Sequence, residues 1–382
     1  MAFALIPRIS ASSSAAVAPP AAAGKKAVAT HGRLEVSALY LEATDDLLRL
    51  VNMPDQQPVW RFPGNDPEVA LGALISAGLD AEAAAALASS GAISLDGGKV
   101  SILPGIDLLV SLSSVVRQSI YSLLAANGLN PHYAKPQLIL GDFEEWMRGS
   151  SLSARQRELL RALLWRQRGV LAFSDVSALM AVAGTAAELE EARRVMTRVR
   201  TLHVRVVPPS GEGVAGFLEY WTAGGLNRAS GPLINAVLEE SSGAGIDLAL
   251  LLPPLARERL YTYPSLQDGV GGRLPDCHWT SLNFFSVRPQ PYYLDARTSY
   301  LSLTQSYLEI PKAERFGDVL AFVSSDGLVL HTCVHVAEDI VFSKNGQLLL
   351  APWLLQRLPD VAAVYGGPDR EVHAFRLRTA PD

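Results

Sequence analysis

The stretch GGRLPDCHWTSLNFFSV, residues 271–287, predicts the start of a helix in the last third of the chain. Pro275 ends the preceding segment, and Asp276 is a good N-cap residue because its carboxylate can accept a hydrogen bond from the first helical turn. Apolar residues then recur on one helical side, at Trp279, Leu282 and Phe285. The pattern places Cys277 in the first turn, where unpaired backbone N–H groups favour a negative charge and lower the pKa of a thiol.

Three segments of alternating or apolar residues follow this helix and predict β-strands. They are GDVLAFVSS (317–325), GLVLHTCVHVA (327–337) and DIVFSKNG (339–346). The dipeptides Asp326-Gly327 and Asn345-Gly346 favour hairpin turns. A helix followed by an antiparallel sheet predicts an α+β domain in the last third of the chain.

The middle strand carries an unusual set of side chains. Because side chains alternate along a strand, one face is expected to hold Val329, His331, Cys333 and His335. The other face is expected to belong to the core, with Leu328, Leu330, Thr332, Val334 and Val336. Thiol catalysis requires a thiolate, a nearby histidine and a group that orients this histidine. Cys277 and His331 are therefore candidates for a nucleophile and its base.

The order of these motifs resembles the NlpC-type cell-wall cysteine peptidases, a papain-like family. The matching residues are Gly271-Gly272, Asp276-Cys277, Gly317-Asp318 and the strand that starts near His331. The resemblance covers about residues 256–382, the last third of the chain. Two departures stand out: His278-Trp279 replaces the Ser-Gly that follows the nucleophile in the family, and Cys333 replaces a glycine.

The resemblance implies a papain-like domain whose nucleophile is Cys277 and whose general base is His331. The third catalytic position falls near Ser343, and Asn345 is an alternative orienting residue. The tyrosine that assists the oxyanion would be Tyr263 or Tyr261. His278, Trp279 and His335 are expected near the substrate. The expected reaction is hydrolysis of an amide bond in a peptidoglycan stem or a related peptide, with no metal or organic cofactor.

Three alternatives stay open for the same residues. Residues His331, Cys333 and His335 could bind a metal ion, with Cys277 or His278 as a fourth ligand. The cysteines Cys277 and Cys333, the only two in the chain, could form a disulfide. The domain could also be a catalytically inactive papain-like adaptor of the cell envelope.

The rest of the chain is less informative. Residues 1–33 are rich in Ala, Ser and Pro and are expected to be a disordered leader, with an export signal as the alternative. Residues 34–255 are expected to form an α-rich domain of unknown role, and no repeat of fixed period is visible. In this domain a helix is predicted from a cap at Ser153 to Gly169. The resemblance favours an exported or periplasmic location.

Composition limits the partners of the protein. The net charge of −5 and the absence of a long basic run argue against nucleic acid as a main partner. No segment of about 20 apolar residues without charges is present, so no integral membrane span is expected. The sequence gives no oligomeric state.

Overall fold

The computed structural model describes residues 30–50, 57–239 and 245–378. The chain divides into two compact units, one made of residues 40–200 and the other of residues 1–39 and 201–382. We refer to them as the N-terminal unit and the C-terminal unit. The expected disorder of the leader falls almost entirely on residues 1–29, which lie outside the described residues.

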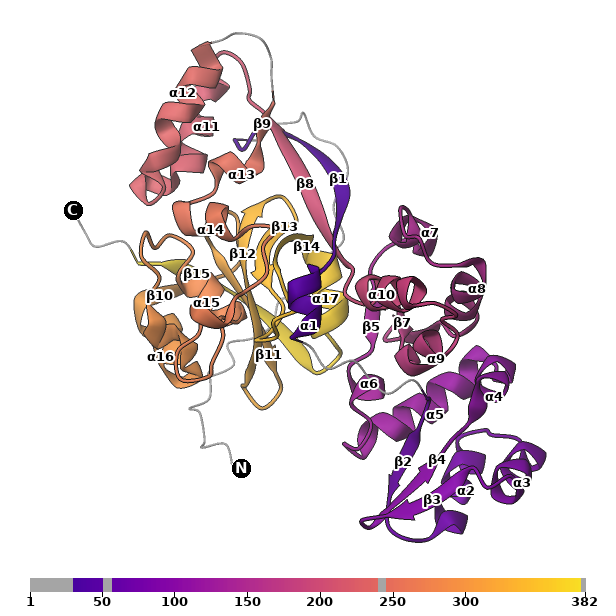
Figure 1. Cartoon of the computed structure of the whole chain (residues 1–382). Helices are drawn as coiled ribbons and strands as arrows, with labels where there is room; N and C mark the ends of the chain where they lie inside the picture. Colours follow the sequence, from indigo (N-terminus) through magenta and orange to yellow (C-terminus); the bar gives the residue numbers. More distant parts are fainter. Residues whose placement is uncertain (1–29, 51–56, 240–244, 379–382) are drawn as a thin grey trace, which may run out of the picture. The chain divides into compact units, whose positions relative to one another are not determined.

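The C-terminal unit is built around a six-stranded sheet with the order β10-β15-β11-β12-β13-β14, in which all neighbouring strands are antiparallel (Figure 1). The strands are β10 (Tyr307–Ile310), β11 (Val319–Ser324), β12 (Val329–Ala337), β13 (Ile340–Lys344), β14 (Trp353–Arg357) and β15 (Arg370–Leu377). The three predicted strand segments therefore form β11, β12 and β13. The prediction of helix and antiparallel sheet in the last third of the chain is confirmed at this level.

Side chains of β11 alternate between two hydrophobic clusters, one on each face of this sheet. Val319 and Ala321 belong to the cluster that contains Trp279 of α15 (Cys277–Leu282), whereas Leu320 and Phe322 belong to the cluster that contains Val361 of α17 (Leu358–Tyr365). Helices thus cover both faces. Other helical elements of the unit are α11 (Gly213–Thr222), α12 (Gly231–Glu239), α13 (Leu248–Leu251), α14 (Pro254–Arg259), η3 (Leu266–Asp268), η4 (Pro291–Leu294) and α16 (Ala296–Ser306).

The expected boundary at residue 255 is wrong, because residues 201–255 belong to the C-terminal unit. Leu202 and Trp221 lie in the same hydrophobic cluster as the strands of the six-stranded sheet. The Thr201 hydroxyl donates a hydrogen bond to the carbonyl oxygen of Leu355 at 2.9 Å and accepts one from its N–H at 3.1 Å. A second sheet, with the order β1-β8-β9, consists of β1 (Arg33–Leu41), β8 (Val199–Val207) and β9 (Ile246–Asp247).

The N-terminal unit contains the same order of elements twice, which the sequence did not reveal. Its first half consists of β2 (Trp60–Pro63), α2 (Pro67–Ser76), α3 (Ala81–Ser89), β3 (Ile93–Asp96), β4 (Lys99–Ile102), α4 (Gly105–Ser111) and α5 (Ser114–Ala126). Its second half consists of β5 (Gln137–Ile139), α7 (Phe143–Met147), α8 (Ala154–Ala162), β6 (Trp165–Gln167), β7 (Val170–Phe173), α9 (Val176–Ala181) and α10 (Ala186–Val195). The sheets have the matching orders β2-β4-β3 and β5-β7-β6. Two shorter helices, α1 (Asp45–Arg49) and α6 (Pro131–Ala134), complete the unit.

The helix predicted from Ser153 to Gly169 ends earlier, at Ala162. Its start is confirmed, because Ser153 and Gln156 form a capping box. The remaining residues instead form the hairpin of β6 and β7, and Gly169 lies in its turn with a φ of 85°. Within the described residues, no single helix is long and apolar enough to cross a membrane, and only the pair α4 and α5, bent by 120°, meets that condition when taken together.

Candidate functional site

Cys277 is the first residue of α15, as the sequence predicts. The Asp276 carboxylate accepts a hydrogen bond from the N–H of Trp279 at 2.8 Å and so caps the helix. The cap satisfies the N–H group of Trp279, the third residue of the helix. The N–H groups of the first two residues, Cys277 and His278, have no acceptor within the helix. Cys277 itself is 5 % exposed.

His331 lies on β12 and is held from two sides. Its Nε2 atom is 2.9 Å from the hydroxyl oxygen of Ser343 on β13. The ring of Tyr365, at the end of α17, stacks on the imidazole with a centroid distance of 3.9 Å and an interplanar angle of 7°. The Nδ1 atom is buried and has no hydrogen-bond partner within the described part of the chain. The ring is therefore held from two sides, and Nδ1 is the nitrogen that remains for an interaction with the Cys277 thiol.

His278 is a second imidazole beside the same thiol. Its Nδ1 atom is 3.2 Å from the hydroxyl oxygen of Thr332, the residue that follows His331 on β12. Burial raises the pKa of the Cys277 thiol, but the nearby imidazoles of His278 and His331 outweigh burial, and the pKa is well below its usual value. Burial lowers the pKa of His278, but the negative charges of Cys277 and Asp276 raise it to about 9. At neutral pH these directions favour a thiolate paired with an imidazolium.

A buried lysine is a further charged group near the thiol. Lys344, the last residue of β13, is 0 % exposed, and its ammonium donates hydrogen bonds to the carbonyl oxygens of Gly346 at 2.6 Å and Leu348 at 3.3 Å. Burial lowers the pKa of Lys344 to about 8, although the negative charges of Asp276 and Cys277 act in the opposite direction. The positive charge of Lys344 therefore adds to the field that stabilises a thiolate.

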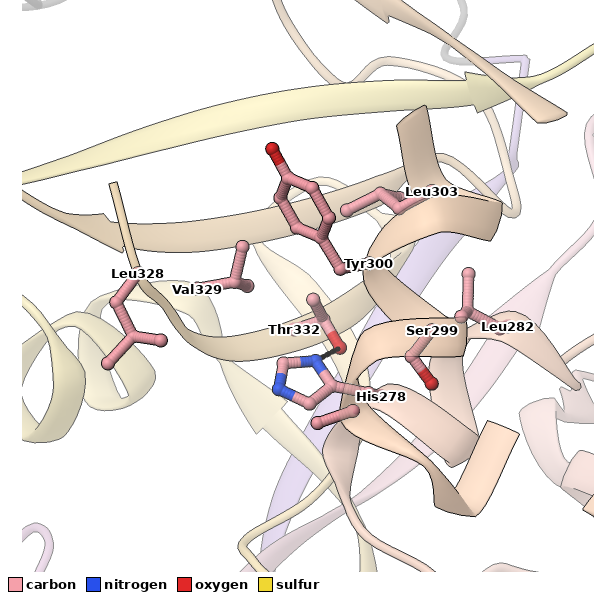
Figure 2. A pocket seen from close by; sticks show the side chains of 9 residues that line it. His278, Leu282, Ser299, Tyr300, Leu303, Leu328, Val329 and Thr332 are labelled. Carbon is pink, nitrogen blue, oxygen red and sulfur yellow. Dashed lines mark hydrogen bonds between the residues drawn. The ribbon is translucent and has the colours of Figure 1, made fainter. Parts of the chain in front are cut away.

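A small cavity adjoins His278 (Figure 2). It lies between α15, α16 and the start of β12, and it holds about 60 Å³ of space for water-sized groups. Its walls are mostly apolar, with Leu282 from α15, Leu303 from α16 and Val329 from β12. The sequence placed Val329 on the face of His331, and this is wrong. The strand register shifts between Phe322 and Val323, so that Leu330 is an extra residue and Val329 lies on the face of Thr332.

The other predicted site residues lie in different surroundings. The Asn345 side chain donates to the Gln356 side chain at 3.3 Å, and Tyr263 is half-buried in the loop after α14. Tyr261, the alternative to Tyr263, donates its hydroxyl to the carbonyl oxygen of Leu202 at 2.6 Å.

Trp279 and His335, which were expected near the substrate, are buried and contact other parts of the C-terminal unit. Trp279 is 4 % exposed and packs in the core near Trp353, because it points from α15 towards the sheet. The ring nitrogens of His335 lie 3.1 Å from the carbonyl oxygen of Arg315 and 3.0 Å from that of Glu338. Neither side chain lines the cavity beside His278.

The geometry also bears on the two alternatives for the cysteines and histidines. Among the described residues, no group of three His, Cys, Asp or Glu side chains could hold a metal ion. Both cysteines are free thiols. Burial raises the pKa of Cys333, and so does the nearby charge of Cys277, so that Cys333 stays protonated in the core.

Three contributors to the site were not found from the sequence. Thr332 was expected to belong to the core, Lys344 only fell within a predicted strand segment, and Tyr365 lies on a helix that no site motif marks. Lys344 is the last residue of β13, and no sequence motif marks its burial. The contact of Tyr365 with His331 depends on how α17 packs on the sheet.

Comparisons with protein-family models, with curated proteins and with solved structures found no match to this chain. The arrangement around Cys277 therefore has to be interpreted from its own chemistry.

Proposed function

We propose that the C-terminal unit is a papain-like thiol hydrolase that cleaves an amide bond, with Cys277 as nucleophile, His331 as general base and Ser343 as the residue that orients His331. The observation that carries the proposal is the hydrogen bond between Ser343 and His331 Nε2, which leaves the buried Nδ1 atom without a partner among the described residues. If Nε2–H donates to the Ser343 hydroxyl, the basic lone pair is on Nδ1, as a general base requires.

The first half of the reaction forms a thioester. The Cys277 thiolate attacks the amide carbonyl carbon, and the carbonyl oxygen becomes an oxyanion that the N–H of Cys277 can stabilise. The tetrahedral intermediate then collapses, and the C–N bond breaks. His331, which holds the proton taken from the Cys277 thiol, passes this proton to the leaving nitrogen, so that a neutral amine departs.

The second half returns the enzyme to its starting state. His331 Nδ1 removes a proton from a water molecule, and the resulting hydroxide attacks the thioester carbonyl. The C–S bond breaks, a carboxylic acid is released and Cys277 becomes a thiolate again. In this scheme His278 is the cation that keeps Cys277 ionised, since its pKa is raised to about 9.

The resemblance of residues 256–382 to NlpC-type peptidases supports a peptide substrate of the peptidoglycan stem class. The six-stranded antiparallel sheet with α15 against β12 is compatible with a papain-like fold. Cys277 is 5 % exposed and does not line the cavity, so in this proposal the substrate approaches the sulfur past His278, which does line it.

Digestion of purified muropeptides and of a panel of short peptide amides tests the proposal. We expect cleavage by the wild type and by Cys333→Ala, the matched control for the second buried cysteine, and none by Cys277→Ala. Mass spectrometry of the wild type mixed with an activated peptide ester should reveal an acyl group on Cys277. The absence of both cleavage and acylation would favour the inactive adaptor.

A further inference from the structure

We infer that the cavity beside His278 is a substrate subsite that accepts a small aliphatic side chain, on the residue whose carbonyl Cys277 attacks. This inference rests on the proposed function and adds the class of substrate. The cavity is bounded by His278, the direct neighbour of Cys277 in the chain and the second imidazole at its thiol. Because the imidazole of His278 interacts with the thiol and also lines the cavity, a group in the cavity can belong to the residue whose carbonyl Cys277 attacks.

The chemistry of the walls excludes a charged or strongly polar occupant. The apolar lining comes from Leu282, Leu303, Leu328 and Val329, and no Asp, Glu, Lys or Arg side chain lines the cavity. The positive charge of His278 is already paired with the Cys277 thiolate, so that the walls hold no free charge for an occupant. A carboxylate or ammonium without a partner in such surroundings would lose its hydration at a high cost in free energy.

Two of the three hydroxyl groups in the walls have partners within the protein that fix their direction. Ser299 donates to the carbonyl oxygen of Tyr293 at 2.7 Å, and Thr332 contacts His278 Nδ1 at 3.2 Å. Figure 2 shows the hydroxyl of Tyr300 directed away from His278. The walls therefore offer contact area rather than hydrogen bonds, and this area favours an aliphatic group.

The size of the cavity sets an upper limit on the side chain. A space of about 60 Å³ corresponds to about four water-sized groups, since one such group needs roughly 15 Å³ by this measure. The side chains of alanine, valine and leucine fit this limit, whereas the ring of phenylalanine exceeds it.

A series of N-acetyl-aminoacyl chloromethyl ketones tests the inference on the full-length protein. In each compound the thiolate displaces chloride and forms a thioether, and the side chain next to the ketone is Gly, Ala, Val, Leu, Phe, Glu or Lys. We expect Val and Leu to inactivate about tenfold or more faster than Gly, because burial of even one additional methylene group is worth about that factor. Glu, Lys and Phe should not exceed Gly. Iodoacetamide has no side chain that could enter the cavity, so its labelling rate measures the reactivity of the Cys277 thiolate alone.

A larger and a smaller side chain at position 329 distinguish a change in the subsite from a general folding defect. Val329→Phe fills the cavity and should reduce the Val and Leu rates to the Gly rate, while Val329→Ala should admit Phe. Val372→Phe, at a half-exposed position of β15 that does not line the cavity, is the matched control and should keep the wild-type order.

Rapid iodoacetamide labelling with equal rates for all side chains, or with Glu or Lys preferred, would overturn the subsite and leave the proposed function intact. Failure of iodoacetamide itself to label Cys277 at pH 6.5 would instead overturn the proposed function, and the subsite with it.

Discussion

Ser343 is the residue on which the assignment of His331 depends. Both side chains are fully buried, so Ser343→Ala leaves Nε2 without a partner at a cost of about 1–3 kcal/mol in the free energy of unfolding. It also frees the ring to change tautomer. We expect kcat for amide hydrolysis to fall by about 10²-fold, the lower part of the range for general acid–base catalysis.

Asn345→Ala is the control for Ser343→Ala, since Asn345 contacts Gln356 rather than His331. It should keep kcat within about twofold, and Ser343→Thr, which restores a hydroxyl, should recover most of the loss. A purely structural role for Ser343 would be indicated if Ser343→Thr and Ser343→Ala lost the same activity at full folding.

The sequence predicted the central residues of this site, because their signals are local. A cap, a first-turn cysteine and a histidine on an alternating strand can each be recognised within a few residues. Ser343 was suggested only by the resemblance, which puts the third catalytic position near it. The ring of Tyr365 and the hydroxyl of Thr332 could not be predicted, because their contacts arise only when α17 and α15 pack on the sheet.

At the scale of single elements, α15 depends on its cap. The helix has six residues and little hydrogen bonding of its own, so Asp276→Ala should lower the free energy of unfolding of the C-terminal unit by about 1 kcal/mol. Asp295→Ala, which removes the equivalent cap of α16, should cost a similar amount. Chemical denaturation measures both.

Asp276→Asn separates the cap from the charge, because asparagine caps as well as aspartate does. We expect it to be close to the wild type in stability. Equal destabilisation by Asn and Ala would show that the charge of Asp276, rather than its hydrogen bond to Trp279, stabilises the helix.

Element ends and registers were harder to predict than element types. The alternation of β12 is correct for His331 and Cys333, but the extra residue Leu330 reverses it for Val329. A register shift depends on the partner strand and leaves no mark in a single strand's sequence. At Gly317, in contrast, the structure explains the residue type at a single position. Its φ of 93° favours glycine, and the ring of Phe285 fills the space that a Cβ atom would need.

At the scale of the whole molecule, the division into units follows the cores rather than the change in composition. The sequence changes character near residue 255, but Leu202 and Trp221 share a core with the six-stranded sheet. Long-range packing of this kind has no local signal. The internal repeat of the N-terminal unit was missed because its halves share topology but no fixed period. Their first strands start 77 residues apart, at Trp60 and Gln137, whereas their last strands start 71 residues apart, at Lys99 and Val170.

The N-terminal unit contains a buried carboxylate that should make its stability depend on pH. Asp175 is 2 % exposed and accepts hydrogen bonds from the hydroxyls of Tyr121 at 2.5 Å and Tyr133 at 3.2 Å. Burial raises the pKa of Asp175 to about 6 from 3.8, although both hydrogen bonds act in the opposite direction. The folded state therefore binds the Asp175 proton more tightly than the unfolded state does. The contribution of this proton to the free energy of unfolding is complete below pH 3.8 and is lost as pH rises through 6.

Asp175→Asn removes this titration. Relative to the variant, the wild-type N-terminal unit should lose up to about 3 kcal/mol of unfolding free energy between about pH 3.5 and pH 7, since one pKa unit corresponds to about 1.4 kcal/mol. Denaturation at several pH values measures the difference, and Asp96→Asn at an exposed position of β3 is the control. A constant difference between wild type and Asp175→Asn across this range would contradict the prediction.

The measurement that tests the central claim most directly is the pH dependence of iodoacetamide labelling at Cys277, followed by peptide mass spectrometry. Because the imidazoles of His278 and His331 hold the pKa of the thiol well below 9, the labelling rate should already be at its plateau by about pH 7. His278→Gln should shift the profile to higher pH, and Cys333 should stay unlabelled in the folded protein. A rate that rises only as pH approaches 9, or labelling of neither cysteine, would contradict a thiolate nucleophile at Cys277.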